Sequence, residues 1–187
     1  LTDAQRDYMD TAVASSRALL GLVDDILDLS RVEAGRLELE LAPFDLRVVL
    51  EDVVDALAPL AANKPVELVL RYLSDTPSRV RGDAARVRQV ATNLVGNAVK
   101  FTAEGHVLVR VDLDASGERP CFVIAVEDTG PGIPAEHQAR VFEKFHQVDG
   151  SSTRAYMGTG LGLAITAQLV ERMAGSVELH SEVGRGS

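Results

Sequence analysis

The chain has 187 residues, with 19 basic and 28 acidic side chains and a net charge of −9. This length allows one well-packed domain with a smaller appendage, and the 46% content of hydrophobic residues predicts a globular core. The negative charge argues against nonspecific binding to nucleic acid or to an anionic membrane face, so a phosphate ligand must be held by local contacts.

A long helix is predicted from Thr2 to about Ala34. This stretch contains no proline, and its apolar residues recur at intervals of three and four. Thr2 can cap the first turn together with Gln5, and Gly35 supplies a stop. The apolar stripe is wider than a monomeric surface helix needs, so we expect this helix to pack against partner helices.

The next segment is predicted to combine one helix with short strands. Asp45 can cap a helix that runs to about Asn63 and is closed by Pro65. Three short strands are indicated by alternating or β-branched residues: 37–41, 66–72 and 79–81. Pro43 interrupts the alternating pattern after the first of them.

The second half begins with a helix from Asp83 through Lys100, and Gly105 ends the loop after it. Then we expect strands over 106–113 and 122–127, a short amphipathic segment over 136–145, a helix over 163–174 and a strand over 176–180. Cys121 is the only cysteine, which excludes an intrachain disulfide, fits a reduced cytoplasmic setting and predicts a buried hydrophobic residue. Because helices and strands do not alternate regularly, we predict an α/β (α+β) two-layer sandwich with a mixed sheet, preceded by one long helix.

Two asparagines lie one turn apart on the helix after Asp83. Asn93 and Asn97 share a face, so their amide oxygens can converge on one ligand. Oxygen donors that leave room for water suit Mg²⁺, and Lys100 one turn further can contact a phosphate. Two asparagines on a helix are also common as solvated surface residues, and this segment alone leaves both interpretations open.

Two glycine-rich segments follow. Asp128 precedes Gly130 and Gly132; its carboxylate can accept from an amine such as that of adenine, although an ordinary turn containing aspartate is equally compatible. A second segment leads directly into the final predicted helix, where backbone N–H groups suit phosphate. Its residues are Gly158, Thr159, Gly160, Leu161 and Gly162. A glycine triplet is weak evidence by itself, because it does not follow a strand as a dinucleotide-binding fingerprint does.

The segment between the two glycine-rich stretches, about 134–158, has few apolar anchors and is typical of a lid over a ligand. Phe142 and Phe145 are predicted to be core residues that fix the base of this lid. Arg154 can reach toward the terminal phosphate of a bound nucleotide.

The order of these segments resembles the GHKL, or Bergerat-type, ATP-binding fold of bacterial sensor histidine kinases, especially those of the hybrid type. Residues 93–97 are similar to its N box, 128–132 to its first glycine box, 142–145 to its F box and 158–162 to its second glycine box. Residues 19–35 are similar to the second helix of the family's dimerisation and phosphotransfer hairpin.

The resemblance implies a domain division and residue roles. Residues 1–36 would be the second hairpin helix and 37–187 the catalytic ATP-binding domain. Asp128 would bind the adenine amine, and Asn97, with Asn93 nearby, would coordinate Mg²⁺. The implied catalytic residues are Asn93, Lys100 and Arg154, and the other implied nucleotide contacts are Gly130, Gly132, Phe145, Gly158, Thr159, Gly160, Leu161 and Gly162.

None of the four histidines is followed by the acidic residue and proline of the family's phosphoacceptor motif. We therefore expect the chain to be a piece of a larger protein in which that histidine precedes Leu1. Such a piece would be unable to autophosphorylate by itself. We also expect the family's last strand to be cut short after Gly186. The implied partners are ATP and ADP, the hairpin histidine, a response regulator receiver domain in a phosphorelay, and a second copy in a homodimer of the parent. We expect this sequence to bind no nucleic acid, to make no direct membrane contact and to lie in the cytoplasm. A membrane anchor elsewhere in the parent protein would be compatible with this location.

Two other functions compete with a kinase. GHKL-type ATPases hydrolyse ATP with a glutamate that activates water, whereas this N box opens with Asn93, whose amide is no base. The other alternative is a degenerate kinase that acts as a scaffold or ligand-sensing module. The intact asparagines, Asp128 and glycines argue against degeneration.

Overall fold

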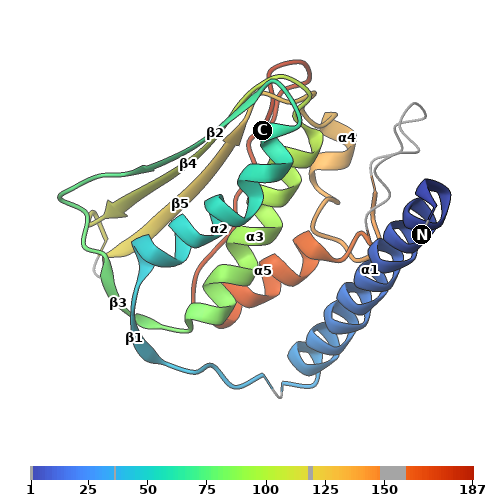
Figure 1. Cartoon of the computed structure of the whole chain (residues 1–187). Coiled ribbons are helices and arrows are strands. Elements are labelled where there is room, and N and C mark those ends of the chain that lie inside the picture. The colour runs from blue at the N-terminus through green and yellow to red at the C-terminus, as the bar shows by residue number, and fades with distance from the viewer. Residues whose placement is uncertain (1, 36, 118–119, 148–158) are drawn as a thin grey trace. The chain divides into compact units, whose positions relative to one another are not determined.

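The computed structural model describes residues 2–35, 37–117, 120–147 and 159–187. It divides into two compact units, Leu1–Glu38 and Leu39–Ser187. The first unit is one helix, α1 (Asp3–Glu33) (Figure 1). Its start is a capping box: the Gln5 N–H donates to Thr2 Oγ1 (3.3 Å) and the Thr2 N–H donates to Gln5 Oε1 (3.0 Å). Gly35 follows with a φ of 67°, so the predicted long helix and both of its end signals are confirmed.

The second unit is a two-layer α/β structure with a mixed sheet. Its elements are β1 (Ala42–Asp45), α2 (Leu46–Ala62), β2 (Val66–Tyr72), β3 (Arg79–Gly82), α3 (Ala84–Phe101), β4 (Gly105–Asp114), β5 (Cys121–Asp128), α4 (Ala135–Gln138) and α5 (Gly162–Arg172). The main sheet has the order β2-β4-β5, with β2 parallel and β5 antiparallel to β4, and β1 pairs with β3 separately. Helices α2 and α3 cover one face of the main sheet, which confirms the predicted fold class (Figure 1).

Alternating side chains along β4 divide the sheet into a buried and an open face. Val107, Val109 and Val111 are at most 1% exposed and belong to one core cluster with residues of α2 and α3. The intervening Arg110 forms ion pairs with Asp112 (2.8 Å) and Glu127 (3.0 Å) on the other face. Burial of the apolar face, at about 25 cal/mol per Å², is what holds α3 on the sheet.

Both long helices of this unit begin at an aspartate, as predicted. Asp45 accepts hydrogen bonds from the N–H groups of Arg47 (3.0 Å) and Val48 (3.3 Å) at the start of α2. Asp83 accepts from the Arg86 N–H (3.0 Å) at the start of α3. Each carboxylate therefore satisfies donors that a helix leaves unpaired in its first turn.

Two predicted strands are wrong. Residues 37–41 form no strand, because the Glu40 N–H donates to the Asp83 carboxylate (3.0 Å) instead of to a neighbouring strand. The strand is β1, which includes Pro43; a strand paired on one side tolerates proline. Residues 176–180 alternate in exposure, but they pair with no neighbouring strand. A strand needs a hydrogen-bonded neighbour, and an alternating sequence pattern does not provide one.

Smaller differences concern Cys121 and the segment after β5. Cys121 is exposed, because it is the first residue of β5 and pairs with Asp114, the last residue of β4. Its side chain is on the same face of the sheet as that of Val123, which is 42% exposed. The predicted amphipathic segment over 136–145 contains only the four-residue helix α4, followed by turns. In the described part of the chain, no helix combines the length and the hydropathy that a membrane span requires.

Candidate functional site

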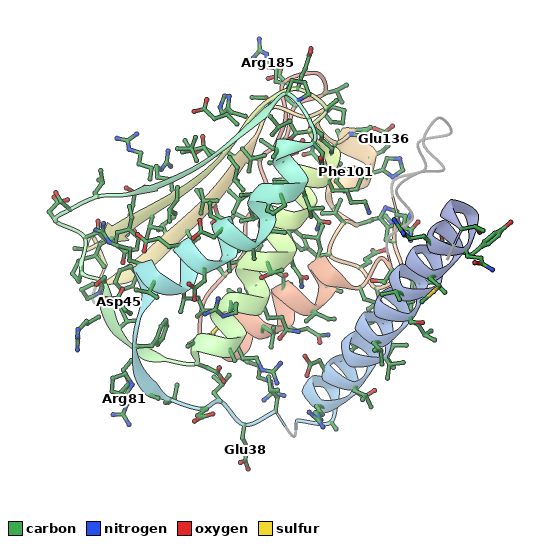
Figure 2. The ribbon with its side chains drawn as sticks, in the orientation of Figure 1. Glu38, Asp45, Arg81, Phe101, Glu136 and Arg185 are labelled. Carbon is green, nitrogen blue, oxygen red and sulfur yellow. The ribbon has the colours of Figure 1, made fainter. Side chains whose placement is uncertain are left out.

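Apart from Phe145, which follows α4, the described ligand-binding candidates lie on α3, on the turn after β5 and on the segment that leads into α5. The residues on α3 are in its C-terminal half, those after β5 begin at Asp128, and those before α5 lead to its N-terminus. Figure 2 shows Phe101 at the C-terminal end of α3 and Arg185 at the tip of the C-terminal turn. Arg154 and Gly158 lie outside the described residues, as does the predicted lid beyond Gln147.

Asn93 brings α3 into contact with the second glycine-rich segment. Its side-chain N–H donates to the backbone carbonyl of Gly162 (3.2 Å), the first residue of α5. The side chain is half-buried, and its amide oxygen accepts no hydrogen bond from a described residue. The contact thus orients the amide and leaves an oxygen that can bind a cation or water.

The N-terminus of α5 has no side-chain cap, in contrast to α2 and α3. Before it, Gly160 has a φ of 69°, and the Leu161 N–H donates to Thr159 Oγ1 (3.0 Å). The Leu161 side chain is fully buried and anchors this loop. An uncapped helix N-terminus offers unpaired N–H groups and a partial positive charge, which suit a phosphate.

Phe145 contacts the same glycine loop through its backbone. Its N–H donates to the Gly160 carbonyl (2.9 Å), and its own φ is 61°. The predicted core position of both phenylalanines is wrong, since Phe142 is half-buried and Phe145 is 67% exposed. Residues three apart share a face only on a helix, and here α4 has already ended at Gln138.

Asp128 ends β5 with a half-buried carboxylate. Its Oδ1 accepts a hydrogen bond from the Gly130 N–H (2.8 Å). Burial raises the pKa of this carboxyl above its ordinary value, while backbone hydrogen bonds from Gly130 and Ser187 oppose that rise. A Cβ on Gly130 would lie 2.7 Å from Oδ1, so glycine permits this arrangement. A partly desolvated acceptor binds an amine donor more strongly than a solvated one.

Gly132 lies against the C-terminal turn of the chain. Its φ is 69°, and a Cβ there would collide with the carbonyl oxygen of Glu182. The Ile133 N–H donates to Ser181 Oγ (2.7 Å), and Gln138 donates to the carbonyls of Ile133 (2.7 Å) and Ser181 (3.0 Å). Ser181 and Gln138 are not predictable from the sequence, because no local pattern relates them to the glycine turn that their hydrogen bonds hold.

Asn97 and Lys100 lie further along α3, and both side chains are half-buried. Burial lowers the pKa of the Lys100 ammonium, and its Nζ lies 4.9 Å from the centre of the Phe101 ring. Among the described residues, Asn97 makes no side-chain hydrogen bond and Lys100 makes no ion pair. These groups are therefore available to a ligand, as the Asn93 amide oxygen is.

An open concavity of about 560 Å³ lies beside the end of β5. It is lined by Glu127, Asp128, Gln138 and parts of residues 179–187. It contains none of the asparagines and none of the glycines that precede α5. We therefore associate it with the edge of the sheet and not with the predicted phosphate contacts.

A family model described as "Histidine kinase-, DNA gyrase B-, and HSP90-like ATPase" matches residues 82–187. The chain is 45% identical over its whole length to signal transduction histidine-protein kinase BarA of Escherichia coli, of which it covers 20%. It is 44% identical to sensor protein GacS of Pseudomonas syringae, of which it covers 21%. The chain thus spans about a fifth of the length of these relatives.

A solved structure also aligns with the whole chain. Full-length ShkA in complex with AMPPNP superposes with a TM-score of 0.83 at 39% identity, over 100% of this chain and 38% of ShkA. The histidine kinase AdeS of Acinetobacter baumannii superposes with a TM-score of 0.76 over 95% of this chain and 79% of AdeS, and its identity of 24% supports the fold alone.

Two glycines with positive φ provide a matched test of the turn after β5. Gly184 has a φ of 80° and open space around its Cβ position, whereas a Cβ on Gly132 meets backbone atoms. We expect Gly184→Ala to lower the free energy of unfolding by about 1–2 kcal/mol through backbone strain alone. Gly132→Ala should cost about 1–3 kcal/mol more because of the collision. Urea unfolding measures both values, and equal losses would contradict the collision.

The raised pKa of Asp128 predicts a pH-dependent cost to stability. Because the folded-state pKa exceeds the unfolded one, the folded chain binds more protons between them, and wild-type stability falls as pH rises through that range from about 4. Asp128→Asn should therefore be more stable than wild type at pH 7, and the difference should shrink toward pH 4. Asp114 is the control, since its hydrogen bonds with Ser116 lower its pKa. Asp114→Asn should be less stable at pH 7, and urea unfolding from pH 4 to 8 that shows the same sign for both variants would refute the assignment.

Proposed function

The chain belongs to the family of histidine kinase-, DNA gyrase B- and HSP90-like ATPases, and on this basis we propose that it binds Mg²⁺-ATP and transfers the γ-phosphoryl group to a histidine in two-component signalling. The observation that carries the proposal is the contact of Asn93 with Gly162, at the uncapped start of α5. This contact joins the Asn93 amide to the first residue of α5, and the uncapped N–H groups at that helix start suit phosphate. The similarity to BarA, GacS and ShkA supports the same function.

Each predicted residue has a proposed role in this site. Asp128 accepts from the adenine amine, and Lys100 contacts phosphate. Asn97 and Asn93 hold Mg²⁺, which when bound neutralises charge on the phosphate oxygens. The other proposed nucleotide contacts are Gly130, Gly132, Phe145, Thr159, Gly160, Leu161 and Gly162, together with Gly158 and Arg154.

The chemistry of Asn93 supports transfer rather than hydrolysis. An amide cannot accept a proton at neutral pH, and the Asn93 side-chain N–H is already donated to Gly162. Phosphoryl transfer mainly requires positioning and neutralisation of charge when the acceptor supplies its own nucleophile. A histidine imidazole is such a nucleophile.

The partners belong to the same proposal. We assign α1 to the second helix of a hairpin that carries the acceptor histidine, and a homodimer of the parent would bring such helices together. The exposed side chains of Met9 (54%), Leu19 (63%) and Ile26 (48%) support helix partners on α1. A receiver domain is the proposed next acceptor, ADP the product, and the cytoplasm the compartment.

Nucleotide binding is tested by Asn97→Ala. We expect the Kd for Mg²⁺-ATP to rise by about tenfold or more, because one metal ligand is removed. Arg88→Ala is the control on the same helix, since it removes only a surface ion pair with Asp52 (2.8 Å). Titration calorimetry measures the Kd of both variants. An unchanged Kd for Asn97→Ala would show that the site is assigned wrongly.

Transfer is tested by adding a separate peptide hairpin that carries the histidine. With labelled ATP, we expect acid-labile label on the peptide, and none when its histidine is replaced by glutamine. Labelling should also fail with the Asn97→Ala chain. If ATP binds and the hairpin docks but no label is transferred, the scaffold alternative is favoured.

A further inference from the structure

The C-terminal end of α3 is satisfied by groups from outside the helix. A helix leaves its last four carbonyls without intrahelical donors. The first of these, on Ala98, accepts from both the N–H (3.0 Å) and the hydroxyl (2.7 Å) of Thr102. Thr102 has an extended backbone, with φ of −76° and ψ of 119°, so no left-handed glycine closes the helix. The next two carbonyls need another donor.

Lys64 supplies that donor from the loop between α2 and β2. Its Nζ donates to the carbonyls of Val99 (2.9 Å) and Lys100 (2.9 Å), and also to that of Thr102 (3.2 Å). An ammonium has three N–H groups, so Lys64 can donate to more than one of these carbonyls at once. Its positive charge also lies at the negative end of the α3 dipole. The side chain is half-buried, so the interaction is partly shielded from water.

The fourth carbonyl, on Phe101, faces the turn after β5. A Cβ on Gly130 would lie 3.4 Å from this oxygen, so the two segments are packed closely. Thr129, next to Gly130, fixes the loop between α3 and β4 from the other side. Its hydroxyl donates to the Glu104 carbonyl (3.2 Å) and accepts from the His106 N–H (3.0 Å). The last turn of α3 is thus held between Lys64 and the turn that carries Asp128.

We infer that Lys64 is a positioning residue for the nucleotide site: its three hydrogen bonds set the last turn of α3, and hence Asn97 and Lys100, against the Asp128–Gly130 turn. Lys64 itself is on a different element from every proposed ligand contact. This inference rests on the proposed function, because it concerns how tightly the same site binds Mg²⁺-ATP. Loss of the ammonium leaves two carbonyls of the helix end unpaired and lets the turn shift, which misplaces both ligand groups.

The test compares Lys64→Met with Lys64→Arg. Methionine keeps the length of the side chain and removes the donors, whereas arginine keeps the charge and can donate to at least two carbonyls. With a non-hydrolysable ATP analogue and Mg²⁺, we expect Lys64→Met to raise the Kd by about tenfold and Lys64→Arg to stay within about threefold of wild type. Calorimetry is done below the melting temperature of each variant, and circular dichroism verifies folding.

A matched control separates positioning from general stability. Asp45→Ala removes the cap at the opposite end of α2, and should lower the melting temperature without changing the Kd. If Lys64→Met fails to fold, Lys64→Gln, which keeps an amide donor, replaces it, with an expected Kd above that of wild type.

A folded Lys64→Met variant, or Lys64→Gln in its place, with the wild-type Kd would overturn the inference while leaving the proposed function intact. A rise in Kd for Asp45→Ala as large as that for Lys64→Met would also overturn it, because general destabilisation would then explain both. Failure of the wild-type chain to bind the analogue would instead refute the proposed function, and this inference with it.

Discussion

The apolar contact between α3 and the buried face of β4 is the interaction on which the rest of the structure depends. Val95 and Val99 are 1% exposed and belong to the same cluster as Val107 and Val109. Because a helix has 3.6 residues per turn, burying these valines fixes the direction of every other side chain on α3. The opposite side of α3 therefore carries Asn93, Asn97 and Lys100. This is the side on which Asn93 contacts Gly162 of α5.

The proposed site lies where some of the usual stabilising hydrogen bonds are absent. Helices α2 and α3 each begin at an aspartate that caps them, whereas α5 begins without a side-chain cap. The Asp128 carboxylate is held half-buried with a raised pKa, although burial disfavours its charged form. Unpaired N–H groups and a partly desolvated carboxylate cost stability in the free protein. The same groups can regain that cost when a ligand pairs with them.

Long-range hydrogen bonds hold these exposed ends in place. Lys64 secures the end of α3, and Thr129 secures the loop after it. Ser181 and Gln138 secure the segment that follows Gly132. None of these four residues has a proposed contact with nucleotide. They connect α2, α3, β5 and the C-terminal turn, so the geometry of the site depends on the packing of the whole second unit.

The fold could be predicted from the sequence wherever the signal is local. The caps at Thr2, Asp45 and Asp83 act within three residues, and the apolar periodicity of each helix is a property of that helix alone. The two strand errors arise because a strand requires a neighbour. The alternating pattern at 176–180 does not provide a neighbour. At 37–41, the Glu40 N–H donates to the Asp83 carboxylate and not to a neighbouring strand.

By itself, the sequence determined which chemical groups are available to a ligand: the paired asparagines of one helix face, a carboxylate followed by glycines, and a glycine-rich entry to a helix. Only the tertiary structure decided which of them meet. It brought the Asn93 side chain into hydrogen-bond contact with the Gly162 carbonyl. It left the Phe145 side chain exposed, although the Phe145 N–H donates to the Gly160 carbonyl. It also brought the Lys64 ammonium to the Val99 carbonyl at the end of α3, 35 residues away in the chain. The physical reason is that side-chain type and short-range hydrogen bonds are written locally, whereas contacts between elements depend on how the apolar faces pack together.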